Sequence, residues 1–184
     1  MSVRINFILG PAFSGKSEFL IKCLDPEKDT VFFGTLPPEQ PAFQKRIDKL
    51  KTLRLEKNPK GWTSSDVTDL PKAVKNSEHP QVTAIDCTYS WLSNLVFQHS
   101  TEAKQSPEQI QQIIFHECQL LVKAIESKAS GDVYIVSSEI GGALASSNPY
   151  ERLLREVNGR LNQQIAFLSD TQILLSAGTP VRIK

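Results

Sequence analysis

The feature that most constrains this chain is an apolar strand that runs directly into a glycine-rich loop. The strand is predicted at Arg4–Leu9, and the loop after it reads Gly10-Pro11-Ala12-Phe13-Ser14-Gly15-Lys16-Ser17, which fits GxxxxGK[ST]. Its glycines permit backbone angles and a close approach that a Cβ would forbid, so successive N–H groups can converge on phosphate oxygens. An amphipathic segment follows at once. The sequence therefore predicts a phosphate-binding loop (P-loop) between a strand and a helix.

The residue types of the loop also predict what it binds. Lys16 is expected to be an exposed point charge that reaches the β- and γ-phosphates of a purine nucleoside triphosphate, either ATP or GTP. The hydroxyl group of Ser17 is expected to ligate Mg²⁺, and the N-terminus of the following helix adds a positive field. The whole loop from Gly10 to Ser17 is thus assigned to nucleotide binding. The alternative is a chance glycine-rich turn, which the flanking strand and helix disfavour.

Predicted strands and helices alternate along the chain, which indicates an α/β fold with a mostly parallel sheet flanked by helices. The further predicted strands are Thr30–Gly34, Val82–Asp86, Val133–Ser138 and a C-terminal antiparallel hairpin of Thr171–Ser176 and Thr179–Ile183. The predicted helices are Ser17–Cys23, Pro41–Leu53, Thr88–Phe97, Pro107–Lys128 and Pro149–Leu168. Glu56–Ser65 is expected to be a loop. With 184 residues, we expect one nucleotide-binding domain over residues 1–184.

Charge balance and cysteine usage narrow the class of protein. Lys and Arg number 21 against 20 Asp and Glu, and the net charge of +1 gives no electrostatic footprint for nucleic acid or an anionic membrane. No apolar run reaches the roughly 18 residues that a membrane span needs. The three cysteines form no CxxC pair, which fits a reducing compartment. We therefore expect a cytoplasmic protein whose partner is a small molecule.

Two carboxylates lie at or just after the carboxyl ends of predicted strands, at the sheet edge where ligands bind in open α/β folds. Asp86 ends the strand that begins at Val82 and is predicted to hold Mg²⁺, directly or through water. The alternative is that Asp86 caps the helix that begins near Thr88. Glu139 follows the strand that ends at Ser138 and is a candidate catalytic residue, as general base for an acceptor hydroxyl or as a second metal ligand. The alternative for Glu139 is an ordinary exposed loop acid.

The last predicted helix carries a polar row beside its apolar stripe. Arg155, Gly159 and Asn162 fall at i, i+4 and i+7, and hence on one face. A glycine inside a helix costs about 1 kcal/mol relative to alanine, which predicts that another group approaches Gly159 closely. Arg155 is a candidate phosphate ligand, and the alternative is a solvated surface row.

In their order along the chain, these motifs resemble the adenosylcobinamide kinase / adenosylcobinamide-phosphate guanylyltransferase family of cobalamin biosynthesis. The resemblance rests on Gly10–Ser17, Gly34-Thr35, Arg46-Ile47 with Arg54, Trp62 with Ser64 and Asp66, Asp86–Leu95, Glu139–Gly141 and Arg155–Gln163. These segments span nearly the whole chain. The resemblance implies a RecA-like P-loop fold and a homo-oligomer, typically a trimer with sites between subunits. It also implies phosphorylation of the aminopropanol hydroxyl of adenosylcobinamide, a corrinoid.

The resemblance assigns roles to further residues. It implies that Thr35 binds the nucleotide, and that Arg46, Arg54, Arg155 and Asn162 are candidates for binding the substrate or a second phosphate group. Mg²⁺ and either ATP or GTP are the implied cofactor and substrate.

One departure concerns the second reaction of the family. Its members transfer GMP from GTP through a guanylylated histidine in Arg-Ile-x-x-His, whereas this chain carries Leu50 at that position. Leucine has no nucleophilic atom, so the covalent step has no evident carrier, and Lys49 or Lys51 would be the substitute. We therefore expect a cobinamide-kinase-like enzyme that has lost guanylyl transfer. The alternatives are a non-catalytic nucleotide-binding paralogue and a kinase of another small alcohol.

A second group of departures lies after the strand that ends at Ser138. Ser138 itself replaces an asparagine of the family pattern, Ala143 replaces its second glycine and Ser146 replaces its proline. The acceptor loop is therefore expected to differ from that of the family.

Overall fold

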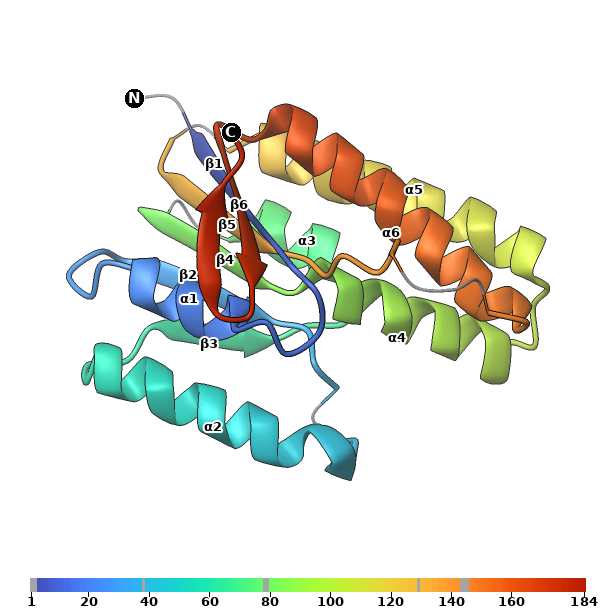
Figure 1. Cartoon of the computed structure of the whole chain (residues 1–184), viewed down its shortest axis with the longest axis horizontal. Helices are drawn as coiled ribbons and strands as arrows, with labels where there is room; N and C mark the ends of the chain where they lie inside the picture. Colours follow the sequence, from blue (N-terminus) through green and yellow to red (C-terminus); the bar gives the residue numbers. More distant parts are fainter. Residues whose placement is uncertain (1–2, 38, 78–79, 129, 143–145) are drawn as a thin grey trace.

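The computed structural model describes residues 3–37, 39–77, 80–128, 130–142 and 146–184, and the structural statements below concern these residues. They form a seven-stranded sheet in the order β3-β2-β4-β5-β1-β6-β7 (Figure 1). The strands are β1 (Arg4–Leu9), β2 (Thr30–Gly34), β3 (Thr63–Asp66), β4 (Val82–Asp86), β5 (Asp132–Val136), β6 (Thr171–Ser176) and β7 (Thr179–Arg182). Neighbouring strands pair in parallel except β6 and β7, which form the antiparallel hairpin. The predicted sheet type is therefore confirmed.

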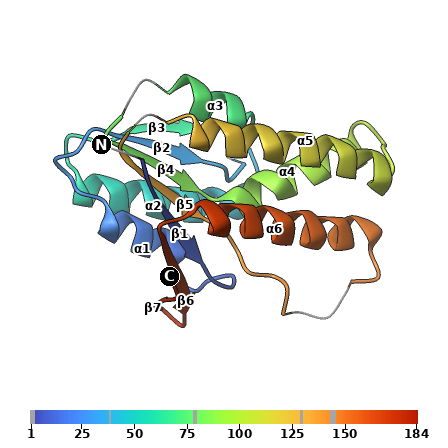
Figure 2. The ribbon, with the colours of Figure 1, turned by 90° about the horizontal axis from the view of Figure 1, so that it is seen from above.

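Helices cover both faces of the sheet (Figure 2). They are α1 (Lys16–Cys23), α2 (Pro41–Lys57), α3 (Leu70–Asn76), α4 (Thr88–Thr101), α5 (Pro107–Glu126) and α6 (Pro149–Leu168). One buried cluster joins the sheet to α3, α4, α5 and α6, and a second cluster joins the other face to α1. No helix of the described chain has the length and hydropathy that a membrane span requires.

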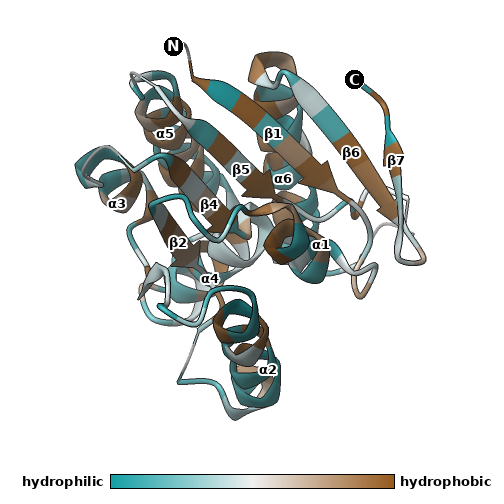
Figure 3. Ribbon diagram, turned by 90° about the vertical axis from the view of Figure 1, so that its left-hand side faces the viewer, coloured by the Kyte–Doolittle hydropathy of each residue, from teal (hydrophilic) through white to brown (hydrophobic). Residues whose placement is uncertain are grey.

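The central strands are apolar on both faces because each face is covered. Phe7 and Ile8 are neighbours on β1, and they point into the two different clusters. Every residue of β4 is buried. Figure 3 shows the hydrophobic residues concentrated in these inner strands, while α2 is largely hydrophilic. The helix α5 starts at a capping box, in which the side chains of Ser106 and Gln109 each accept a hydrogen bond from the other's backbone N–H.

The structure corrects the prediction for the segment after α2. Glu56–Ser65 was expected to be a loop, but α2 continues to Lys57 and β3 begins at Thr63. The helix α3 was also absent from the prediction, although Asp69 caps it by accepting a hydrogen bond of 3.1 Å from the backbone N–H of Lys72. The helix is held by Leu70 and Val74, whose side chains are fully buried.

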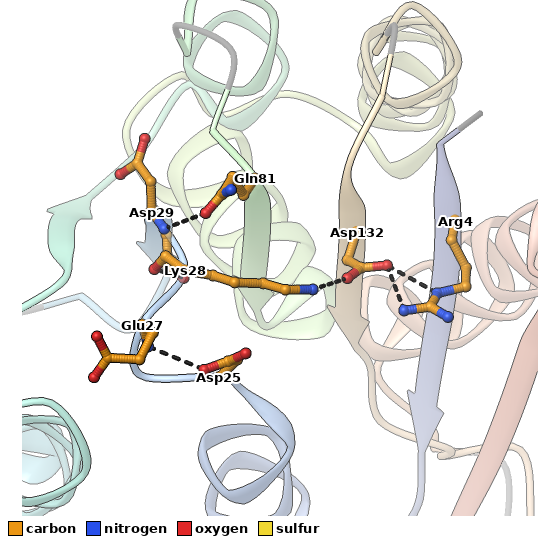
Figure 4. A network of polar contacts seen from close by, with 8 residues as sticks. Arg4, Asp25, Glu27, Lys28, Asp29, Gln81 and Asp132 are labelled. Carbon is orange, nitrogen blue, oxygen red and sulfur yellow. Dashed lines mark hydrogen bonds and ion pairs between the residues drawn. The ribbon is translucent and has the colours of Figure 1, made fainter. Parts of the chain in front are cut away.

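A network of polar side chains ties the strands together at the amino ends of the sheet (Figure 4). Asp132, the first residue of β5, accepts hydrogen bonds from Arg4 Nε at 2.8 Å and from Lys28 Nζ at 2.9 Å. Gln81 Oε1 accepts from the backbone N–H of Asp29 at 3.0 Å. Burial raises the pKa of Asp132, but the hydrogen bonds from Lys28 and Arg4 outweigh it and hold the pKa below its ordinary value. This network joins β1, β2, β4 and β5 at the edge opposite the P-loop.

Candidate active site

The P-loop lies between β1 and α1, as the motif predicts. Gly15 stands at the N-cap of α1 with φ of 91°, a left-handed backbone angle that favours glycine. At Gly10 a Cβ would lie only 2.5 Å from the carbonyl oxygen of Leu175 on β6, so the loop can pack here only without a side chain. The turn of the hairpin completes the support, because the backbone N–H of Gly178 donates to the Ser14 carbonyl at 3.2 Å. The C-terminal hairpin thus braces the P-loop from one side.

The sequence predicts that Lys16 is an exposed charge, but in the structure this residue is buried. The residue is only 6% exposed, and its Nζ donates a hydrogen bond of 2.6 Å to the carbonyl oxygen of Pro11. Burial lowers the pKa of Lys16. The ammonium group is therefore held across its own loop by a backbone carbonyl group.

Ser17 and Asp86 come together at the carboxyl ends of the strands. The hydroxyl group of Ser17 donates to Asp86 Oδ1 at 3.0 Å, and Asp86 is 8% exposed. Burial raises the pKa of Asp86, while the hydrogen bond from Ser17 and the charges of Arg46, Arg54 and Lys16 act in the opposite direction. Three cations therefore act on one buried carboxylate.

The helix-cap alternative for Asp86 is wrong. The N-cap of α4 is Cys87, whose sulfur accepts from the backbone N–H of Ser90 at 3.4 Å. The Asp86 carboxylate is instead directed at Ser17.

The Ser17–Asp86 pair fits a magnesium ion. Both side chains offer hard oxygen ligands, and Mg²⁺ in nucleotide sites takes one or two protein oxygens together with phosphate oxygens and water. Among the described residues no group of three His, Cys, Asp or Glu side chains forms a metal cage. A metal bound by Ser17 and Asp86 would therefore take phosphate oxygens and water as its remaining ligands.

Thr35 shapes the edge beside Asp86. Its hydroxyl group donates to the Cys87 carbonyl at 2.7 Å and accepts from the Cys87 N–H at 2.8 Å. Asn94 on α4 donates to the Thr35 carbonyl at 2.9 Å. The Thr35 side chain, predicted to bind nucleotide, thus fixes the backbone after Asp86. Sequence reasoning missed Asn94, whose contact with Thr35 spans 59 residues.

Two cavities meet at the P-loop. The one of about 450 Å³, here called the α2-side cavity, is bounded by Phe13–Glu18 and by Lys45, Arg46, Lys49 and Leu50 of α2. The one of about 720 Å³, here called the Asp86-side cavity, is lined by residues that include Ala12, Phe43, Asp86, Tyr89, Asn94 and Ser138. Phe13, Lys16, Ser17 and Arg46 line both cavities. The described residues therefore form one branched cleft with the P-loop at the branch point.

Helix α2 brings Arg46 and Leu50 to this cleft, while Arg54 lines a separate small pocket that also touches Leu50 and Asp86. The Arg46 guanidinium carbon lies 5.9 Å from the ring centroid of Phe13. The Arg54 guanidinium carbon lies 4.4 Å from the ring centroid of Phe32. Leu50, 7% exposed, forms part of the wall facing the P-loop. The structure thus places the histidine position of the family beside the predicted phosphate site.

The remaining candidates lie around the segment after β5. Asn162 Nδ2 donates to the Ser138 carbonyl at 3.2 Å, and Asn158 Nδ2, which sequence reasoning missed, donates to the same oxygen at 2.9 Å. The exposed Glu139 accepts from the Gly141 N–H at 2.6 Å, and Arg155 donates to the Gly141 carbonyl. Ser138 lines the Asp86-side cavity. The amides of α6 therefore position the backbone at the cavity wall.

Two expectations for this region have different outcomes. A Cβ at Gly159 would meet nothing within 4 Å in the described chain, so the predicted close approach is wrong within a single subunit. Ala143 lies outside the described residues, so the departure there has no structural account.

The comparisons with known proteins agree with this geometry. The family model for cobinamide kinase / cobinamide phosphate guanyltransferase matches residues 6–183. The chain is 30% identical to the bifunctional adenosylcobalamin biosynthesis protein CobU of Salmonella typhimurium and 24% identical to that of Escherichia coli, in each case over 96% of this chain and 98% of the relative.

A solved ATPase from the type III secretion system of pathogenic bacteria shares the fold. The TM-score is 0.54 at 14% sequence identity, and the likeness covers 94% of this chain and 52% of that chain. The motifs, the P-loop fold and the family match together lead to one assignment. This chain belongs to the cobinamide kinase / cobinamide phosphate guanyltransferase family.

Proposed function

We propose that this protein is a kinase that uses a nucleoside triphosphate and Mg²⁺ to phosphorylate the aminopropanol hydroxyl of adenosylcobinamide. The observation that supports it most is the hydrogen bond of 3.0 Å between Ser17 and the buried Asp86, next to Lys16 in the P-loop. A serine, a carboxylate and a lysine in this arrangement are the groups that phosphoryl transfer requires. Membership of the family supports the corrinoid acceptor.

Each residue has a distinct role in this proposal. The P-loop N–H groups and Lys16 hold the phosphate chain and neutralise charge that develops on it during transfer. Ser17 and Asp86 hold the magnesium ion, which supplies electrostatic stabilisation to the phosphate oxygens when bound. Arg46 adds positive charge from α2, where it lines both cavities beside the loop.

The acceptor is proposed to occupy the Asp86-side cavity. That cavity contains the metal-binding carboxylate and is lined by apolar and amide-bearing side chains, among them Phe43, Tyr89 and Asn94. Such a mixture suits a large ligand with both apolar and amide groups. Glu139 follows Ser138 on the cavity wall and is the candidate to orient the acceptor hydroxyl.

We propose that covalent guanylyl transfer has been lost. Leu50 occupies the wall where a nucleophile would have to stand, and it offers no lone pair. Lys49, the nearest substitute in sequence, pairs with Glu18 at 2.5 Å, and a protonated amine in an ion pair is not a nucleophile. As part of the same proposal, the protein is a cytoplasmic homo-oligomer, a trimer by analogy with the family.

Calorimetric titration with MgATP, MgGTP and cobinamide, followed by a phosphoryl-transfer assay on adenosylcobinamide, tests this function. We expect saturable binding of a magnesium nucleotide and phosphorylated corrinoid as the product. Nucleotide binding with no turnover on any alcohol would favour a non-catalytic paralogue. Turnover on a different alcohol, with none on corrinoids, would favour the altered acceptor.

A further inference from the structure

Phe13 has an exposure and a backbone angle that are unusual for a phenylalanine. Its side chain lies on the P-loop and is 92% exposed, and its backbone φ of 58° lies in the left-handed region. Residues with a Cβ rarely adopt this region, and an aromatic ring in water contributes nothing to the core. Strained positions of this kind cluster at ligand sites.

Phe13 lies beside both branches of the cleft. Its ring lines the α2-side cavity and the Asp86-side cavity, and so does the Arg46 side chain. The Arg46 guanidinium carbon lies 5.9 Å from the centre of the ring, and Arg46 is itself exposed. The two side chains therefore stand together at the branch point, one on the loop and one on α2.

In the proposed function, the metal held by Ser17 and Asp86 sets which way the nucleotide lies in this cleft. Asp86 lines the larger cavity and not the α2-side cavity, so the phosphate to be transferred and its acceptor belong on the Asp86 side. The opposite end of the nucleotide then extends toward the first turn of α1 and toward α2. The α2-side cavity, of about 450 Å³, lies within the usual size range of small-molecule sites.

We propose that Phe13 is the stacking surface for the purine base of the nucleotide, and that the Arg46 guanidinium covers the other face of the base. The inference rests on the proposed nucleotide-binding function and names the base site within it. Purines stack on aromatic rings and on guanidinium planes, and the exposed Arg46 can move away from Phe13 to admit a ring between them. Because stacking uses the π-face alone, Phe13 recognises adenine and guanine alike.

Two substitutions at Phe13 test the stacking role. Phe13→Leu keeps an apolar side chain but removes the π-face, and we expect it to weaken MgATP and MgGTP binding by about 5- to 150-fold. Phe13→Trp keeps the π-face, and we expect affinity close to that of the wild type. The matched control is Phe167→Leu, which changes a phenylalanine that is 84% exposed at the end of α6. We expect that control to leave nucleotide binding unchanged.

A direct measurement accompanies the affinities. Stacking on Phe13 shifts the base H8 proton upfield by the ring current, and the wild type is expected to show this shift on binding MgATP while Phe13→Leu loses it. Equal affinity of Phe13→Leu and the wild type, or an H8 shift that survives the substitution, overturns the inference. An equal loss of affinity for magnesium tripolyphosphate also overturns it, because Phe13 would then act on the loop and not on the base. Failure of the wild type to bind any nucleotide would instead overturn the proposed function itself.

Discussion

Ser17 and Asp86 are 69 residues apart in sequence, yet the Ser17 hydroxyl group donates a hydrogen bond of 3.0 Å to the Asp86 carboxylate. Ser17 follows β1 and Asp86 ends β4, and these strands are not neighbours, because β5 lies between them in the sheet. Parallel strands bring their carboxyl ends to the same edge, and this topology assembles the pair. The sheet thus brings together a hydroxyl group and a carboxylate that no local segment contains, and these are the two proposed magnesium ligands.

The first prediction follows from the burial of Asp86. Since burial raises its pKa, the ionised carboxylate opposes folding at neutral pH, and Asp86→Asn should increase the free energy of unfolding of the metal-free protein. This increase in the free energy of unfolding should shrink as the pH falls toward the ordinary aspartate pKa of about 3.9, because the wild-type carboxyl group then becomes protonated and, like asparagine, carries no charge. Urea denaturation in the presence of a chelator measures both effects.

The same substitution should have the opposite effect on ligand binding. Asp86→Asn removes a charge from the proposed metal site, so magnesium-dependent nucleotide binding should weaken more than binding without metal. Calorimetry with and without Mg²⁺ measures the difference. Equal losses under the two conditions would contradict a metal role for Asp86.

Lys16→Ala should weaken binding of a magnesium nucleotide by at least about tenfold, because charge-assisted hydrogen bonds to phosphate are worth about 1.5–3 kcal/mol. Circular dichroism and thermal melting should show a folded protein, since burial lowers the pKa of Lys16 and its charge does not favour the fold. Lys22→Ala, on the same helix but exposed, is the matched control. Unchanged affinity in a folded Lys16→Ala variant would contradict the assignment of the loop.

The contribution of Asp132 to stability should depend on pH in the opposite direction to that of Asp86. Its pKa is lowered in the folded protein, so it contributes stability above the ordinary aspartate pKa of about 3.9, and this stability is lost as the pH falls through the folded value. Asp132→Asn should therefore destabilise the protein at pH 7 by about 1–2 kcal/mol and leave nucleotide affinity unchanged. Denaturation curves at pH 7 and at pH 3 test this pH dependence. The difference in the free energy of unfolding between Asp132→Asn and the wild type should be smaller at pH 3 than at pH 7.

The parts of the fold that the sequence predicted are those with local signals. The glycine-rich loop and the capping box at Ser106 each mark an element within a few residues. By contrast, β3 reads Thr-Ser-Ser-Asp and lacks large apolar residues, and it is a strand because it pairs with β2. The signal for α3 was present, since Asp69 is an N-cap residue and Pro71 stands in the first turn.

The candidate site also divides into residues that local motifs predict and contacts that only tertiary packing creates. Lys16, Ser17 and Asp86 follow from motifs, whereas the contacts of Thr35 with Cys87 and of Asn158 with Ser138 join distant segments and leave no periodic pattern. The helix row that includes Arg155 was correctly placed on one face. Which loop that face contacts depends on tertiary packing, and it is the segment after β5.

The protein should form no covalent GMP adduct with GTP. An imidazole nitrogen can attack the α-phosphate and later leave, but Leu50 offers only aliphatic carbon. Incubation with α-labelled GTP and Mg²⁺, followed by denaturing electrophoresis, should therefore show no labelled band. A band that survives denaturation would contradict the prediction, and its lability in acid or alkali would separate a histidine adduct from a lysine adduct.

Leu50→His should restore the adduct if the rest of the site is competent. Leu50 is 7% exposed and lines the α2-side cavity together with Ser14, Lys16 and Ser17, so an imidazole introduced there would face the phosphate-binding loop. Lys51→His is the matched control, since it adds the same group to the next, exposed position of α2. We expect a labelled band from Leu50→His and none from Lys51→His. Equal labelling of the two variants would show that any histidine on this helix reacts, and would contradict the specific geometry of position 50.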